Sequence, residues 1–203
     1  LNWPDPKNSF SSISEIKNSV FRNLFDAIDA TKTPVNIHIY NNTFYHVIDD
    51  VFQLGSAGYD IEVNDNVMIG VGSGVSWHGS GSPPSGKIST KYIHHNVIDA
   101  SIPYLYGRKD PGNLLGGRYD GPKGDGMATG RAFGMHTRTS ITGPDPWKIY
   151  QNTIKIAQDI DGRGVEHSYF IEPFDQTFPH EVYNNIFVQA ADSEIADSAR
   201  VAD

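Results

Sequence analysis

The sequence predicts an all-β protein, a parallel β-helix in which short strands coil around one elongated core. The first observation behind this prediction is a repeat: an apolar residue, two further residues, Asn or Ser, one residue and a second apolar residue. The second is the composition, with 20 glycines and 12 prolines in 203 residues, which favours many turns over long helices.

The repeat recurs at irregular but similar spacings. Its anchors are 23, 24, 30, 56 and 33 residues apart, at Ser19, Asn42, Asn66, Asn96, Asn152 and Asn185. The strands that carry it are expected at 15–21, 37–44, 61–68, 92–98, 147–154 and 181–187. Units of this length with alternating apolar residues bury their apolar faces only by stacking, so we expect a solenoid of about six coils over 1–203.

Stacking the repeats places similar residues in columns. One interior column is predicted to hold Ile39, Val63, Ile93, Ile149 and Val182, and a second Phe21, Phe44, Met68, Ile98, Ile154 and Phe187. Asparagines at one bend can hydrogen-bond to the coils on either side, which predicts an asparagine ladder.

The composition also excludes several classes of protein. A net charge of −8 argues against a nucleic-acid partner, because phosphate binding needs a basic surface. The absence of cysteine excludes disulfides and thiolate metal sites. No apolar run reaches the roughly 20 residues that a membrane-spanning helix needs.

The stretches "NIHIYNNTF", "YDIEVNDNVMIG", "KYIHHNVID" and "WKIYQNTI" resemble the right-handed parallel β-helix proteins of the pectate-lyase-like superfamily. That superfamily includes polysaccharide lyases, pectin-type hydrolases, uronate epimerases and non-catalytic surface proteins, so the resemblance implies a secreted or cell-surface protein that meets polysaccharide. Such helices usually carry an amino-terminal cap and more coils, so we expect neighbouring coils to lie outside this chain.

Two adjacent aspartates are assigned different roles. Aligning the repeats puts Asp49 in one column with Asp26 and Ser73, which is typical of a turn, because Asp and Ser hydrogen-bond their own backbone. Asp50 then falls in a column with Ala27 and Gly74 and has no charged neighbour there. "IDDVFQL" is also similar to the double-aspartate segment of pectin-type hydrolases, so Asp50 is the residue assigned chemistry.

The candidate catalytic residues are Asp50, His78, Arg108 and Lys109, from three successive coils. In β-elimination the arginine would neutralise a uronate carboxylate while His78 or Lys109 takes the neighbouring proton. Asp50 is also the candidate metal ligand, with Ca²⁺ as the possible cofactor. The alignment pairs Gln53 with Trp77, two candidate substrate-binding residues, and Leu54 with His78.

Two outward columns of the asparagine-bearing strands are further candidates. One contains Tyr40, Asn64, His94, Tyr150 and Tyr183, and its neighbour His38, Glu62, Tyr92, Lys148 and Glu181. Tyr40, His94 and Tyr150 are predicted to stack sugar rings, although aromatic residues also favour strands for structural reasons. His94 and His95 are expected on opposite faces of the strand, unable to bind one metal together.

A Gly-rich segment, 103–146, is predicted to be a long loop insertion. Its part at 107–143 carries six Lys or Arg residues and three Asp residues, a net charge of +3. Such a segment on an acidic protein is a plausible anion-binding site, with Arg131 as a candidate substrate contact.

Three functions remain open. The leading one is an extracellular lyase on a uronate-containing polysaccharide. The second is a hydrolase that uses Asp50 with Asp26 or Asp49 on the same kind of polymer. The third is a non-catalytic polysaccharide-binding or surface protein. Each has polysaccharide as the partner.

Overall fold

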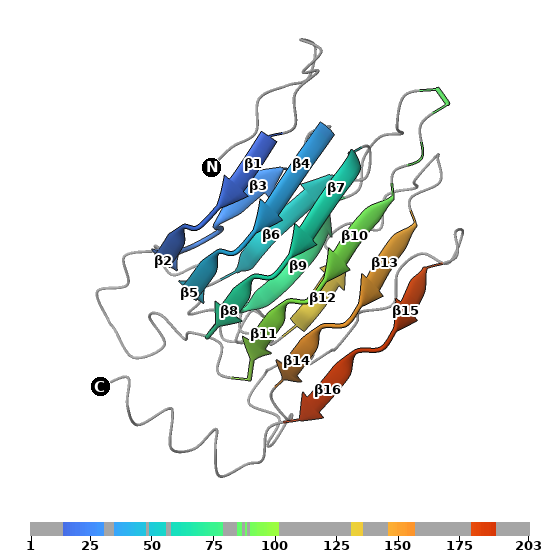
Figure 1. Ribbon diagram of the computed structural model, residues 1–203. Coiled ribbons are helices and arrows are strands. Elements are labelled where there is room, and N and C mark those ends of the chain that lie inside the picture. Colours follow the sequence, from blue (N-terminus) through green and yellow to red (C-terminus); the bar gives the residue numbers. More distant parts are fainter. Residues whose placement is uncertain are drawn as a thin grey trace, which may run out of the picture.

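The computed structural model describes residues 14–30, 35–47, 49–55, 58–78, 85–86, 88, 90–101, 131–135, 146–156 and 180–189. Every regular element in these ranges is a β-strand, and these strands pair in parallel (Figure 1). The all-β prediction is therefore confirmed for the described part of the chain. The described residues include no helix that is long and apolar enough to cross a membrane.

The strands form three parallel sheets. The first sheet consists of β1 (Ser14–Lys17), β4 (Val35–Tyr40), β7 (Tyr59–Asn64), β10 (Lys91–His94), β13 (Trp147–Tyr150) and β15 (Glu181–Tyr183). The second consists of β2 (Val20–Leu24), β5 (Thr43–Val47), β8 (Val67–Ile69), β11 (Val97–Ala100), β14 (Thr153–Ile156) and β16 (Ile186–Gln189). The third consists of β3 (Ile28–Ala30), β6 (Asp50–Gly55), β9 (Ser73–His78) and β12 (Arg131–Met135). Neighbours in each sheet come from successive repeats, an arrangement compatible with a parallel β-helix.

One predicted boundary is wrong. Residues 131–135, inside the range predicted to be loop, form β12, which pairs with β9 in the third sheet. Gly130 directly before this strand and Gly134 within it concealed it in the sequence. The rest of the predicted insertion, apart from residue 146, lies outside the described residues.

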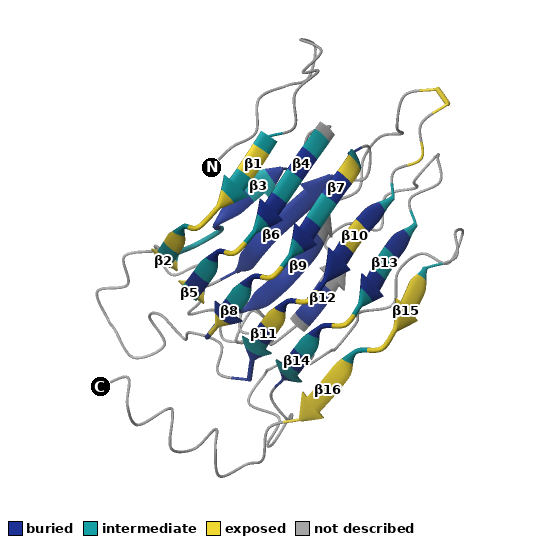
Figure 2. Ribbon diagram, in the orientation of Figure 1, coloured by how far each residue is buried: buried dark blue, intermediate teal, exposed yellow. Residues whose placement is uncertain are grey.

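The register of the two predicted interior columns is confirmed, but Val182 and Phe187 are not interior. Each is 43% exposed and lies on the last strand of its sheet, β15 or β16. Residues 39, 63, 93, 149 and 182 are register partners across the first sheet, and residues 21, 44, 68, 98, 154 and 187 are partners across the second. The rings of Phe21 and Phe44 stack with centroids 4.8 Å apart, and Phe44 meets Phe52 of the third sheet edge to face. The core therefore lies between the sheets, where β6 is buried along its whole length (Figure 2).

A bend joins each strand of the first sheet to its successor in the second. The residue before each anchor has a left-handed backbone with φ between 53° and 55°, at Asn18, Asn41, Asp65, His95, Gln151 and Asn184. Asparagine, aspartate and histidine enter this region more readily than most residues. The recurring conformation turns the chain at the same position in each repeat.

The anchor asparagines make the same hydrogen bonds from one repeat to the next. The Asn66 side-chain amide donates to Ile39 O at 2.9 Å and to Asn96 Oδ1 at 3.0 Å. Asn42 donates in the same way to Ile16 O and Asn66 Oδ1. Asn66 and Asn96 are buried, and a buried amide is stable only when its donors and acceptors are paired.

Candidate functional site on the outward face of the first sheet

The first sheet carries a polar and aromatic outward face. The strand register confirms both predicted columns. The partners in one are Tyr40, Asn64, His94, Tyr150 and Tyr183, and in the other His38, Glu62, Tyr92, Lys148 and Glu181. Lys17 and Glu15 of β1 extend the two columns by one strand. On β7 and β13 these residues alternate with buried ones. The structure therefore places three predicted substrate-binding residues, Tyr40, His94 and Tyr150, on one face.

The rings of this face stack on one another. His94 and Tyr150 have centroids 4.7 Å apart with planes 13° from parallel, and Tyr150 and Tyr183 lie 5.0 Å apart with planes 1° from parallel. Face-to-face rings cover one another and leave mainly their edges and polar atoms accessible. This face therefore presents hydroxyl, imidazole and amide groups rather than ring faces.

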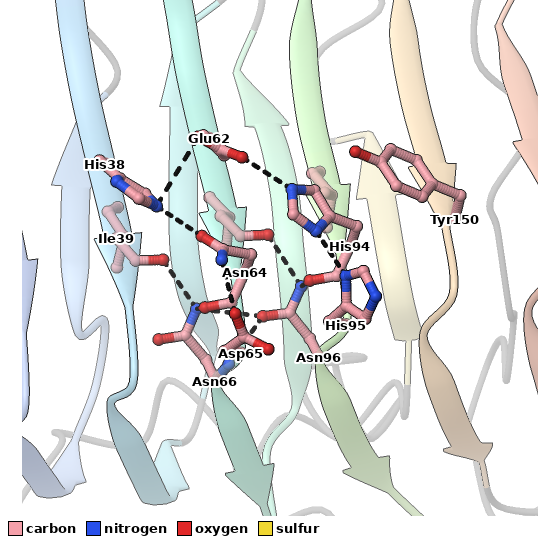
Figure 3. Close-up of polar contacts among 12 residues, drawn as sticks. His38, Ile39, Glu62, Asn64, Asp65, Asn66, His94, His95, Asn96 and Tyr150 are labelled. Atoms are coloured by element: carbon pink, nitrogen blue, oxygen red, sulfur yellow. Dashed lines mark hydrogen bonds and ion pairs between the residues drawn. The ribbon is translucent and has the colours of Figure 1, made fainter.

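Glu62 lies between two histidines (Figure 3). His94 Nε2 is 2.8 Å from Glu62 Oε1, and His38 Nε2 is 3.7 Å from Glu62 Oε2. His38 Nε2 also lies 2.6 Å from Asn64 Oδ1. The alignment had put His38 and Glu62 in the neighbouring column without assigning either a role, because nothing in the sequence shows that side chains from two columns meet.

His95 joins this group, against expectation. His95 Nδ1 lies 2.7 Å from His94 Nδ1, so the prediction that the two rings point to opposite faces is wrong. Strict alternation holds only for extended backbone, and His95 sits at the left-handed bend with φ 55°. The sequence did carry a signal, because His95 precedes an anchor asparagine.

Ion pairs and burial adjust the titration of this face. Burial is the largest cause that raises the pKa of the Tyr150 hydroxyl, followed by the nearby Tyr183 and Glu62. Its hydrogen bond to Glu181 raises the pKa of Lys148, whose Nζ is 3.1 Å from the carboxylate. The hydrogen bond from Lys17 is the main cause that lowers the pKa of Glu15.

The predicted columns around the double aspartate are wrong by one residue. Asp50, not Asp49, is the register partner of Ser73, and Ala27 N donates to Asp50 O at 3.1 Å. The turn from Phe44 to Asp50 is one residue longer than the corresponding turn from Met68 to Ser73, and these two pairs are in register. Alignment without gaps could not detect that extra residue.

The same slip affects Gln53, Trp77 and His78. Gln53 is the register partner of Ser76, Leu54 of Trp77 and Gly55 of His78. Asp50 and His78 therefore lie at opposite ends of paired strands, roughly 17 Å apart along the strand direction. The backbone of Arg131 is in register with Ser73. The side chains of Trp77, His78 and Arg131, and all of Arg108 and Lys109, lie outside the described part of the structure.

Three carboxylates meet near the start of β6. Asp26, Asp49 and Asp50 each offer an oxygen within 4.8 Å of the others. Asp49 is 8% exposed and Asp50 fully buried, and Gln53 Nε2 donates to Asp50 Oδ2 at 3.1 Å. The neighbouring Ser73 Oγ is buried and has no hydrogen-bond partner among the described residues. Clustered carboxylate and hydroxyl oxygens are the donors that Ca²⁺ prefers, so these residues fit the predicted cation.

No protein-family model, curated protein or solved structure matches the chain.

Proposed function

We propose that this chain is a carbohydrate-active protein of the cell exterior that binds a uronate-containing polysaccharide and cleaves it by β-elimination. The outward face of the first sheet carries the proposal. It lines up hydroxyl, imidazole, amide and carboxylate groups in two register columns across a six-stranded sheet. In a lyase these groups would bind the polymer and transfer protons.

The scaffold we propose is a right-handed parallel β-helix of the pectate-lyase-like type, with six coils and an asparagine ladder. Three parallel sheets, each built from successive repeats, support it. So do the hydrogen bonds that link Asn42, Asn66, Asn96 and Asn152 to the next anchor.

The dimensions of the face favour a polymer over a small ligand. Strands in a sheet lie about 4.8 Å apart, so six of them span about 24 Å. A chain of sugars that crosses the strands would meet the same two columns repeatedly. A monosaccharide would contact only a small part of this surface.

The charge pattern favours an acidic polymer. The segment 107–143 has a net charge of +3 in a chain whose net charge is −8. Local positive charge raises the concentration of anionic ligands near it. Arg108, Lys109 and Arg131 belong to this segment and remain the proposed contacts to uronate carboxylates, with Gln53, Trp77 and His78 as further proposed site residues.

The proposed Ca²⁺ would be held by Asp26, Asp49 and Asp50, with Ser73 as an additional oxygen donor. Once bound, it would supply positive charge that offsets repulsion among the carboxylates. Because Asp49 and Asp50 are buried, this charge would stabilise the turn into β6 rather than contact a polymer. The same burial does not favour a hydrolase in which these carboxylates attack a sugar.

Binding without cleavage is the second candidate. It is favoured by the ring stack of His94, Tyr150 and Tyr183. Rings that pack on one another form a rigid surface, which suits binding. Such a face can present hydrogen-bonding groups to a polymer without any chemical step.

One experiment distinguishes the candidates. The protein is incubated with polygalacturonate, with alginate and with a neutral glucan. New ultraviolet absorbance from an unsaturated uronate is the expected result. New reducing ends without that absorbance would indicate a hydrolase, and binding alone would indicate the non-catalytic protein. No binding and no cleavage of either polyuronate would overturn the proposal.

A further inference from the structure

Glu62, His94 and His95 are connected in one hydrogen-bonded series. Glu62 Oε1 is 2.8 Å from His94 Nε2, and His94 Nδ1 is 2.7 Å from His95 Nδ1 (Figure 3). His94 is 9% exposed, while His95 lies exposed at the bend. The series therefore runs from a half-exposed carboxylate through a buried imidazole to an exposed one.

The chemistry of the partners fixes where the protons lie. A carboxylate only accepts hydrogen bonds, so His94 Nε2 carries the hydrogen that points to Glu62. A neutral His94 then has an accepting Nδ1, and His95 must donate from its own Nδ1. That tautomer leaves His95 Nε2 as the atom that can accept a proton. Within the described ranges, His95 Nε2 has no hydrogen-bond partner.

Charged and aromatic groups surround the histidine pair. Glu62 lies on β7 and Asp65 at the bend after it. The backbone N of Asp65 is 3.4 Å from His94 O. On β13 the Tyr150 ring stacks on His94 and lies edge-on to His95, with centroids 6.4 Å apart. His38 and Lys148 are the nearby groups that carry or can carry positive charge.

We propose that Glu62, His94 and His95 form a proton relay that makes the imidazole of His95 the general base of this face. The relay is the carboxylate–imidazole arrangement that orients and activates a base, extended by one further imidazole. Glu62 and His94 are positioning residues, and His95 is the catalytic residue. The catalytic use of His95 rests on the proposed function, whereas the relay itself does not.

The reaction is balanced without any co-reactant. His95 Nε2 takes the proton next to the uronate carboxylate, and the electrons of that C–H bond form a C=C bond. The C–O bond on the adjacent carbon breaks, and the leaving oxygen takes the proton back from His95. One proton moves from carbon to oxygen, and His95 returns to its neutral form.

The relay can be tested without substrate, by NMR of the ring nitrogens in the ¹⁵N-labelled protein. In the neutral rings we expect His94 with hydrogen on Nε2 and His95 with hydrogen on Nδ1. Glu62→Gln should put part of the His94 hydrogen on Nδ1, because a side-chain amide can donate to Nε2 as well as accept from it. Glu181→Gln, which alters a carboxylate on the same column, should leave the pair unchanged. Hydrogen on Nε2 of neutral His95, or the same His94 tautomer in the wild type and in Glu62→Gln, overturns the relay.

The catalytic use is tested with polygalacturonate. His95→Gln should lower kcat at least about 100-fold, the usual scale for a general base, with KM changed less than about twofold. Added imidazole should restore part of the rate to His95→Ala. His46→Gln is the matched control, since His46 also has a left-handed backbone, φ 53°, but lies in the second sheet. Unchanged kcat in His95→Gln overturns the catalytic use of His95. A wild type that cleaves no polyuronate overturns the proposed function, and the NMR result then decides the relay alone.

Discussion

The side-chain amide of Asn66 donates to Asn96 Oδ1 at 3.0 Å, although the two residues are 30 positions apart in sequence. Asn96 Oδ1 also accepts a hydrogen bond from the Asn66 backbone at 3.1 Å. One asparagine therefore pairs the backbone and the side chain of the preceding repeat. Because each asparagine both donates and accepts in this way, the repeats are fixed in register.

Replacing Asn66 by alanine should destabilise the protein by about 1–3 kcal/mol, the usual cost of leaving buried groups unpaired. Chemical denaturation would measure the change. Asn64→Ala is the control, because Asn64 ends β7 two residues before Asn66 and its side chain points outward. Equal stability of Asn66→Ala and the wild type would show that these hydrogen bonds contribute nothing.

Calcium should raise the melting temperature if Asp26, Asp49 and Asp50 bind it. A ligand at 100 times its Kd stabilises the folded state by about 2.7 kcal/mol. Calorimetry with added Ca²⁺, and again after chelation, would measure the shift. Asp50→Asn should remove it and Ser73→Ala should reduce it, whereas Asp60→Asn, at an exposed position, should not. An unchanged melting temperature in the wild type would exclude the site.

Alkaline pH should destabilise the protein through Tyr150. Its pKa is raised above the ordinary value in the folded state, mainly by burial. The unfolded chain therefore loses this proton at a lower pH than the folded chain does. The contribution is fully present below the unfolded pKa, near 10, and is lost as the pH rises through the folded pKa. Unfolding free energies between pH 8 and 11 should fall less steeply in Tyr150→Phe than in Tyr92→Phe. Identical slopes in these two variants would contradict the assignment.

Binding of polygalacturonate should weaken with salt, since the proposed selection for acidic polymers is electrostatic. The Debye length falls from about 10 Å at 0.1 M to about 3 Å at 1 M salt. Arg108→Lys should lose much of the binding, because lysine cannot hold a carboxylate with two parallel hydrogen bonds. Arg118→Lys should lose little. Salt-insensitive binding, equal for a neutral glucan, would remove the basis for an acidic substrate.

The repeat was enough to predict the register of the interior and outward columns. Each asparagine anchor lies at the bend between a strand of the first sheet and the next strand of the second sheet, so it fixes the alignment of both. In the third sheet, which has no such anchor, the predicted columns of Asp49 and Asp50 were wrong. One extra residue in the turn before β6 moves every later position by one, and turn length has no periodic signal. The strand at 131–135 was missed for a related reason, since its glycine-rich surroundings hide its alternation.

The site was harder to predict than the fold. Tyr40, His94 and Tyr150 were placed on one face by alternation alone. The pairing of Glu62 with His94 depends on how far side chains reach across columns, which the sequence does not encode directly. The contact between His94 and His95 depends on a left-handed backbone at His95. That conformation becomes visible only when the residues before all the anchors are compared.

The most direct measurement is the structure of the protein bound to an oligogalacturonate. We expect the sugar chain to bind across the outward face of β4, β7, β10 and β13, in contact with Tyr40, His94 and Tyr150. His95 Nε2 should then lie within about 3 Å of the carbon that carries a uronate carboxylate, because a general base must reach the proton that it takes. An oligosaccharide bound on another surface, with this face empty, would contradict the account.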